Sequence, residues 1–200
     1  MTQPASRRDE LLTLAATMFA ERGLKSTTVR DIADSAGILS GSLYHHFKSK
    51  EQMVEEVLKD FLDWLFERYQ EIVAGESTPL DRVKGLFMAS FEAIEHRHAQ
   101  VVIYQDEAKR LSALPQFAFV DDRNREQRKM WVDLLHEGIA DGSFRPDLDV
   151  DLVYRFIRDT TWVSVRWYQP GGPLTAEEVG RQYLAIVLGG ITQTDQKETP

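Results

Sequence analysis

The side chains that could do chemistry gather in one short stretch, between Thr27 and Phe47. This stretch combines hydroxyl groups, an arginine, a tyrosine and two adjacent histidines with two glycines. Such side chains form hydrogen bonds with phosphate oxygens and with base edges. A glycine inside a helix costs stability, so Gly41 indicates that something large approaches that face closely. The chemistry predicted here is nucleic-acid recognition.

Catalytic and metal chemistry have much weaker support. The sequence has no Walker loop, no G-x-G-x-x-G, no G-x-S-x-G and no H-E-x-x-H. His45 and His46 would point about 100° apart on a helix, so they cannot easily share one metal ion. Asp147–Asp151 imitates the start of a calcium loop, but Leu152 stands where glycine is required and Arg158 where the final glutamate is required. We expect no catalytic residue, no metal and no cofactor, and an enzyme is the alternative class.

Hydrophobic spacing predicts the helices that position the polar stretch. A helix over 7–21 ends at Gly23, and Thr28 with Asp31 forms a capping box that opens a second, short helix. A turn at Gly37 leads to a third element over 40–47, which makes a helix-turn-helix. The residues expected to face its core are Ile32, Ala36, Ile38, Leu43 and Phe47.

Helical signals continue through the rest of the chain, so the predicted fold class is all-α with about nine helices. We find no alternating strand pattern longer than about four residues and no internal repeat. The sequence divides into a helix-turn-helix domain over 1–50 and an effector-binding and dimerisation domain over 51–200, with a flexible tail of about nine residues. The later helices are expected at about 49–74, 83–94, 99–111, 118–140, 150–168 and 175–190.

Composition narrows the class of protein further. The 200 residues include no cysteine, which excludes disulfides and thiolate sites. No stretch approaches the ~20 apolar residues of a membrane span, so we expect a cytoplasmic protein with no membrane partner. The net charge of −8 is uneven, because residues 1–50 carry +2 and residues 51–200 carry −10. The first quarter is therefore electrically suited to DNA although the whole chain is acidic.

The polar stretch resembles the DNA-binding domain of the TetR family of bacterial regulators. The matching motifs are Thr28-Val-Arg-Asp-Ile-Ala33, Ala36-Gly37, Gly41-Ser-Leu-Tyr-His-His-Phe47 and Lys50-Glu51. The resemblance implies that the third helix enters the major groove of an operator. By position, the residues near base edges or adjacent backbone are Arg30, Leu39, Ser40, Gly41, Ser42 and His45, and those near phosphates are Thr28, Tyr44 and Lys50. Leu39 departs from the small polar residue usual in the family, and a leucine there could contact a thymine methyl.

The apolar surface of the last two helices predicts a homodimer, and a two-fold dimer binds a palindromic operator. Their apolar surface exceeds what one helix pair can bury, and pairing with a two-fold copy makes a four-helix bundle. The resemblance implies the same interface. Its expected residues are Val163, Trp167, Val179, Tyr183, Ile186 and Val187. The alternative is that this stripe belongs to the core of one chain.

The middle helices predict a pocket for a small effector. Arg158 and Trp162 lie four residues apart, so a guanidinium beside an indole could anchor an anionic ligand. The alternatives are an ordinary aromatic core and an ion pair of Arg158 with a nearby acid. The full set of candidate effector residues is Phe61, Trp64, Phe87, Phe91, Tyr104, Asn124, Gln127, Trp131, Arg158 and Trp162.

Three later segments strongly resemble the TetR-type repressors of late steroid-ring (cholesterol) catabolism. They are Glu92–Glu107, Arg128–Asp133 and Tyr154–Tyr168. The resemblance implies release from DNA by a coenzyme A (CoA) thioester of a partly degraded steroid. Candidates for its phosphates are Arg110, Arg155 and Arg166. The alternatives are a regulator of lipid metabolism with another hydrophobic effector and a DNA-binding protein controlled by a protein partner.

Overall fold

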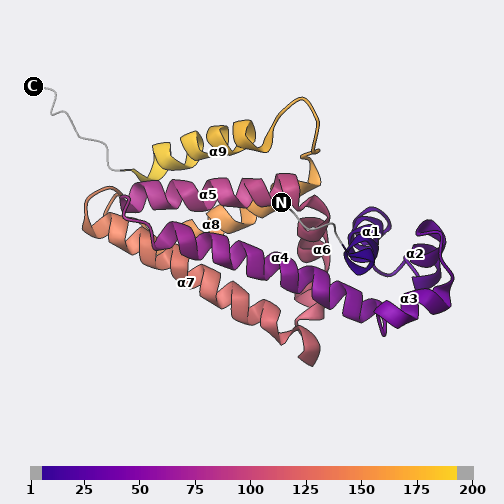
Figure 1. Ribbon diagram of the computed structural model, residues 1–200. Coiled ribbons are helices and arrows are strands. Elements are labelled where there is room, and N and C mark those ends of the chain that lie inside the picture. The colour runs from indigo at the N-terminus through magenta and orange to yellow at the C-terminus, as the bar shows by residue number, and fades with distance from the viewer. Residues whose placement is uncertain (1–5, 193–200) are drawn as a thin grey trace, which may run out of the picture. The chain divides into compact units, whose positions relative to one another are not determined.

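The computed structural model describes residues 6–192, and its regular elements there are helices. Nine α-helices and two short 3-10 helices in this part of the chain confirm the all-α prediction (Figure 1). None of the helices in 6–192 combines the length and apolar composition needed to cross a membrane. The elements are α1 (Arg7–Arg22), α2 (Val29–Ser35), α3 (Ser40–His46), α4 (Lys50–Val73), α5 (Pro79–His96), α6 (His98–Leu111), η1 (Pro115–Phe117), α7 (Ala118–Ala140), α8 (Val150–Val163), η2 (Ser164–Arg166) and α9 (Ala176–Ile191).

Side-chain caps fix where several helices begin. Thr28 caps α2 in a reciprocal box with Asp31, which confirms the predicted box, and Thr175 caps α9 in the same way with Glu178. Ser6 caps α1 in the same way with Asp9, a box that the sequence reading did not identify. Gly37 follows α2 with a φ of 67°, a conformation that favours glycine and makes the turn into α3.

The bounds of three helices differ from the sequence prediction, and α5 begins at Pro79 instead of near 83. α8 ends at Val163 instead of near 168, because the chain tightens into 3-10 geometry at Ser164. The Ser164 hydroxyl donates to the Thr161 carbonyl at 2.6 Å, a local bond that competes with the helical ladder. α9 continues through the two glycines to Ile191, whose carbonyl accepts from the Arg145 amide at 3.0 Å.

Packing divides the described residues into two compact units. The first contains residues 6–63 and 97–122, and the second contains 64–96 and 123–192. These units do not coincide with the functional division at residue 50 that the sequence predicts. The predicted flexible tail lies outside the described residues, apart from Thr192.

The core of the first unit lies where α1, α2 and α3 meet, and α1 also packs against α6 (Figure 1). Phe19, Ile32, Leu43 and Phe47 are buried there, as the helix-turn-helix pattern predicts. Ala36 and Ile38 are half-buried at the turn. This core fixes which face of α3 remains outside.

In the second unit α5 packs along α9 (Figure 1) and also contacts α8. Gly180 permits the close approach, because a Cβ there would lie 3.0 Å from Phe91 Cδ2 and 3.2 Å from Met88 Sδ. Glu95 of α5 accepts hydrogen bonds from the Tyr168 hydroxyl and, at 3.0 Å, from the Ala176 amide at the start of α9. Burial of the phenol and its bond to Glu95 raise the pKa of Tyr168 to about 12, so it remains a donor.

The caps make stability depend on acid pH. Hydrogen bonds from the Thr28 hydroxyl and amide hold the pKa of Asp31 below its ordinary value of ~3.9. A lowered carboxyl pKa means that the stabilisation is present above the ordinary value and is lost as the pH falls through the folded value. At pH values below about 4, we expect the melting temperature of the wild type to decrease as the pH is lowered. The melting temperature of Asp31→Asn should decrease less steeply.

Thermal unfolding between pH 3 and 7 measures this difference. Asp34→Asn is the matched control, since Asp34 lies on the same helix, is exposed and caps nothing. Identical pH profiles for Asp31→Asn and the wild type would contradict the prediction.

Candidate nucleic-acid interface and effector pocket

The outer face of α3 is exposed, and the first turn of the helix carries only small residues. Leu43 is buried in the core, whereas Leu39, Tyr44 and His45 lie outside; Leu39 is 80 % exposed and Tyr44 is 55 % exposed. Ser40, Gly41 and Ser42 form the first turn, where the largest side chain is the hydroxymethyl group of serine. This face can meet a groove of DNA without a bulky obstacle.

Gly41 is not required by the fold of the chain itself. It has ordinary helical geometry, and a Cβ added there would meet no atom of this chain within 4 Å. Since glycine within a helix costs roughly 0.5–1 kcal/mol relative to alanine, the fold carries this cost without a packing reason. An approaching partner would supply such a reason.

Lys50, at the start of α4, holds the loop before α2. Its ammonium donates to the carbonyl of Leu24 at 2.7 Å and to that of Thr27 at 3.0 Å. Thr27 directly precedes the cap residue Thr28 and is itself buried, with its hydroxyl bonded to the Met18 and Gly23 carbonyls. The predicted phosphate contact at Lys50 therefore has one of three N–H groups left to make it.

A second polar contact joins α1, the end of α3 and α4. Arg8 donates to Glu56 at 2.7 Å, and its guanidinium lies 4.6 Å from the ring centre of Phe47. Gln52 links to this pair by donating to Glu56 at 3.0 Å and accepting from the Lys48 amide at 2.7 Å. The hydrogen bond with Glu56 raises the pKa of Arg8, so its guanidinium remains positively charged.

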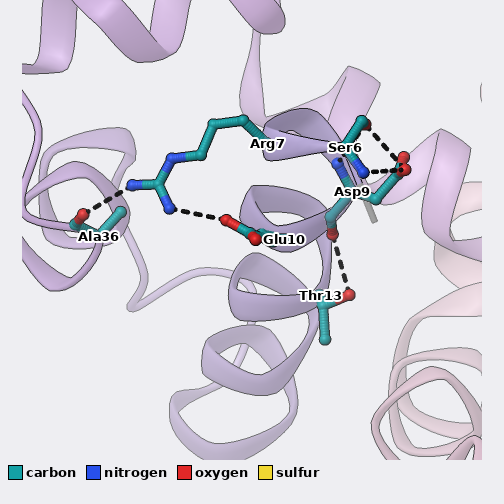
Figure 2. A network of polar contacts seen from close by, with 6 residues as sticks. All are labelled: Ser6, Arg7, Asp9, Glu10, Thr13 and Ala36. Carbon is teal, nitrogen blue, oxygen red and sulfur yellow. Dashed lines mark hydrogen bonds and ion pairs between the residues drawn. The ribbon is translucent and has the colours of Figure 1, made fainter. Parts of the chain in front are cut away.

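Arg7 reaches from α1 to the turn of the helix-turn-helix (Figure 2). Its guanidinium donates to the Ala36 carbonyl at 3.1 Å and pairs with Glu10 at 2.8 Å. Ala36 is the C-cap residue of α2, directly before Gly37, so this bond ties the turn to the first helix. The sequence reading counted Arg7 and Arg8 only as charge, and their spacing alone gives no signal of these partners.

The other predicted DNA-binding residues lie on the same unit. Thr28 is exposed at the start of α2, where its hydroxyl is engaged with Asp31 at 2.6 Å. Arg30 extends from α2 with 83 % of its side chain exposed and lies 3.7 Å from Asp34. Exposed pairs of this kind contribute little to stability, so the guanidinium can exchange partners.

The second unit contains a small cavity of about 20 Å³ among α4, α5, α7 and α8. Four predicted effector residues line it: Gln127, Trp131, Arg158 and Trp162. Phe87 packs edge-on against Trp131 at 5.1 Å, behind this wall. The sequence reading missed five further lining residues, Tyr69, Ser90, Tyr154, Ile157 and Thr161.

Other predicted effector residues lie outside this lining. Phe61 and Tyr104 belong to the first unit, where their rings pack 5.9 Å apart. Phe91 packs on Tyr183 at 5.8 Å, and Trp64 and Asn124 are half-buried in the second unit.

Arg158 lies at the exposed edge of the cavity. It pairs with its neighbour Asp159 at 2.7 Å, and its guanidinium is 5.8 Å from the ring centre of Tyr154. Of the candidates for CoA phosphates, Arg155 and Arg166 are exposed in the same unit, and Arg110 pairs with Glu107 in the first unit.

The predicted dimer residues form an exposed apolar surface on the second unit. Ile186 is 76 % exposed and Trp167 is 59 % exposed, an unusual exposure for residues with apolar side chains of this size. With Leu174, Val179 and Tyr183 they line an open hollow. Val163, the last residue of α8, is exposed. Val187, next to Ile186 on α9, is half-buried.

The fold and the helix-turn-helix geometry define a bacterial DNA-binding regulator. Residues 11–57 match the bacterial regulatory proteins of the tetR family, and residues 76–191 match the tetracyclin repressor-like C-terminal domain. The chain belongs to the TetR family, which confirms the resemblance, and it is a transcriptional repressor of the TetR type.

Two of the relatives to which the chain is most similar share the name KstR2. The chain is 84 % identical over 193 residues to the HTH-type transcriptional repressor KstR2 of Mycolicibacterium smegmatis, covering 96 % of this chain and 94 % of that protein. The structure of the ketosteroid transcriptional regulator KstR2 of Mycobacterium tuberculosis has a TM-score of 0.94 at 74 % identity, with 96 % and 98 % of the two chains covered. A distant structure, AibR with isovaleryl coenzyme A and operator DNA, shares the fold with a TM-score of 0.79 at 22 % identity over 90 % and 97 % of the chains. The two KstR2 relatives are named as a transcriptional repressor and a transcriptional regulator.

The contact of Lys50 gives a prediction for stability. Lys50→Met leaves the Leu24 and Thr27 carbonyls without their charged donor, and we expect a loss of about 1–2 kcal/mol in the free energy of unfolding. Denaturant titration measures the loss. Lys48→Met, which removes an exposed charge two residues away, should leave stability nearly unchanged. Equal stabilities for the two variants would contradict the positioning role of Lys50.

Proposed function

We propose that the protein represses transcription by binding a palindromic operator as a homodimer, and that a CoA thioester of a steroid-ring degradation intermediate releases it. The observation that carries the DNA-binding part is the exposed, unobstructed face of α3 around Gly41. The observation that supports the effector is the aromatic cavity with a guanidinium at its edge.

The residues of α3 lie in the major groove of this proposed complex. Leu39, Ser40, Gly41, Ser42 and His45 face base edges or the adjacent backbone, because they occupy the first turns of the exposed helix face. Arg30 extends from α2 toward the same DNA, and Thr28, Tyr44 and Lys50 contact phosphates.

A dimer follows from the reach of one such element. One recognition helix covers only a few base pairs, and two-fold pairing places two of them one helical turn apart on the operator. The exposed apolar surface around Trp167 and Ile186 is the proposed interface, because burying it removes two large side chains from water.

The chemistry of the cavity suits an amphipathic effector. Trp131 and Trp162 provide apolar walls, and Arg158 at the edge can bind an anionic group such as a phosphate. The relative from M. tuberculosis is described as a ketosteroid regulator, and AibR holds an acyl-CoA on the same fold. Both support a CoA thioester with a steroid-derived body.

Release requires coupling between the effector and the DNA-binding residues. α4 is continuous from Lys50 to Val73 and supplies residues to both units, among them Lys50 in the first and Tyr69 in the second. An effector that binds the DNA-free state better than the DNA-bound state shifts the equilibrium, typically by ~1–3 kcal/mol.

A DNA-release titration tests the effector. We expect steroid-ring CoA thioesters to displace the protein from its operator at concentrations at least about tenfold lower than the matching free acids or fatty-acyl-CoA esters. Thermal stability in the presence of each ligand is the second readout, because binding to the folded state raises the melting temperature. Release by the free acids or by fatty-acyl-CoA alone, or by no thioester at all, would contradict the proposed effector.

A further inference from the structure

Leu39, at the start of α3, is an exposed apolar residue that the fold of this chain does not explain. Among the large apolar residues of 6–192 it is the most exposed, at 80 %. The three residues that follow it are Ser40, Gly41 and Ser42, so leucine is the bulkiest exposed side chain at this end of the helix. Keeping a leucine in water costs free energy that contact with another apolar group would recover.

Leu39 also occupies a position where a polar side chain would stabilise the helix. It is the N-cap residue of α3, with extended backbone geometry and no side-chain cap. Its carbonyl accepts from the Ser42 amide at 2.9 Å, so the backbone starts the helix while the side chain makes no capping bond. Four other helices in the described part of the chain begin with a capping hydroxyl or carboxylate, from Ser6, Thr28, Asp149 and Thr175. α3 therefore has an exposed leucine in place of a stabilising cap.

The major groove of DNA offers one apolar partner for such a side chain. The N-terminal residues of the recognition helix in a helix-turn-helix contact base edges in this groove. Guanine, cytosine and adenine present hydrogen-bond donors and acceptors there, whereas thymine also presents its 5-methyl group. Because leucine neither donates nor accepts, it would displace water from the polar edges without replacing the lost hydrogen bonds. The thymine methyl is the group that it can contact without this cost.

We infer that Leu39 is a specificity-determining residue that contacts the 5-methyl group of one thymine in each half of the operator. The inference rests on the proposed DNA binding by α3 and names the chemical group that this face selects. Gly41 leaves the same turn open for a close approach, since a Cβ added there would meet no atom of this chain within 4 Å.

Removal of thymine methyl groups one position at a time tests the inference. The probe is the duplex of highest affinity that the wild-type protein selects from a random-sequence pool. At each thymine position in turn, deoxyuridine replaces thymine in both half-sites, which removes the methyl group and keeps the base pair. We expect one position at which the affinity of the wild type falls about tenfold, because each half-site loses the burial of one methyl group.

A truncated side chain should abolish this sensitivity. Leu39→Ala should bind the thymine duplex at least about tenfold more weakly than the wild type and should bind the thymine and deoxyuridine duplexes equally at that position. The matched control is Leu114→Ala, which truncates an exposed leucine of the same unit outside the helix-turn-helix and should keep the wild-type difference. The difference should be the same at low and high salt, because the contact involves no charge.

Leu39→Ser separates recognition from a structural role. Serine provides a capping hydroxyl, so the melting temperature of this variant should equal or exceed that of the wild type, while its preference for thymine over deoxyuridine is lost. A clearly lower melting temperature would show that Leu39 supports the fold and would overturn the inference.

The remaining outcomes distinguish this inference from the proposed function. If no deoxyuridine position weakens binding of the wild type, or if Leu39→Ala keeps the wild-type sensitivity at every position, the role of Leu39 is overturned while operator binding by α3 stands. If the wild-type protein selects no sequence from the pool, both the role of Leu39 and the proposed operator binding are overturned.

Discussion

The DNA-binding face depends on the contacts that the first turns of α4 and of α1 make with a short helix and its loops. α3 has only seven residues and no side-chain cap, so it is too short to be stable alone. Leu43 and Phe47 hold it through burial, while Lys50 fixes the loop before α2 and Arg7 fixes the turn before α3. The outer face of α3 takes no part in these contacts.

The two units differ in how their polar and apolar groups are satisfied within the chain. In the first unit, charged side chains near α3 are paired with carbonyls and carboxylates, and these contacts fix the position of α3. In the second, Gln127 keeps an unpaired amide nitrogen in an aromatic cavity, and Trp167 and Ile186 keep apolar surface exposed. Features that cost stability in an isolated chain are consistent with binding an effector and a second copy.

Local chemistry explains what the sequence predicts well. The capping boxes at Thr28 and Thr175 and the burial of Leu43 depend on neighbours a few residues away, and the structure agrees with each. The 3-10 turn at Ser164 was missed because it arises from a hydroxyl that competes with the helical ladder. The partners of Arg7, Arg8 and Lys50, and Tyr69 and Ser90 in the cavity, come from contacts between helices that periodicity does not encode.

Gly41→Ala separates the two roles of the exposed α3 face, because alanine there should stabilise the helix while adding a methyl group on the side that meets DNA. The free energy of unfolding and the operator affinity are measured on the same preparation, with Thr17→Ala, an exposed change on α1, as the control. We predict that Gly41→Ala raises stability by roughly 0.5–1 kcal/mol and weakens operator binding, whereas the control leaves binding unchanged. A Gly41→Ala variant that is more stable and binds the operator as tightly as the wild type would show that α3 does not need a glycine to approach DNA.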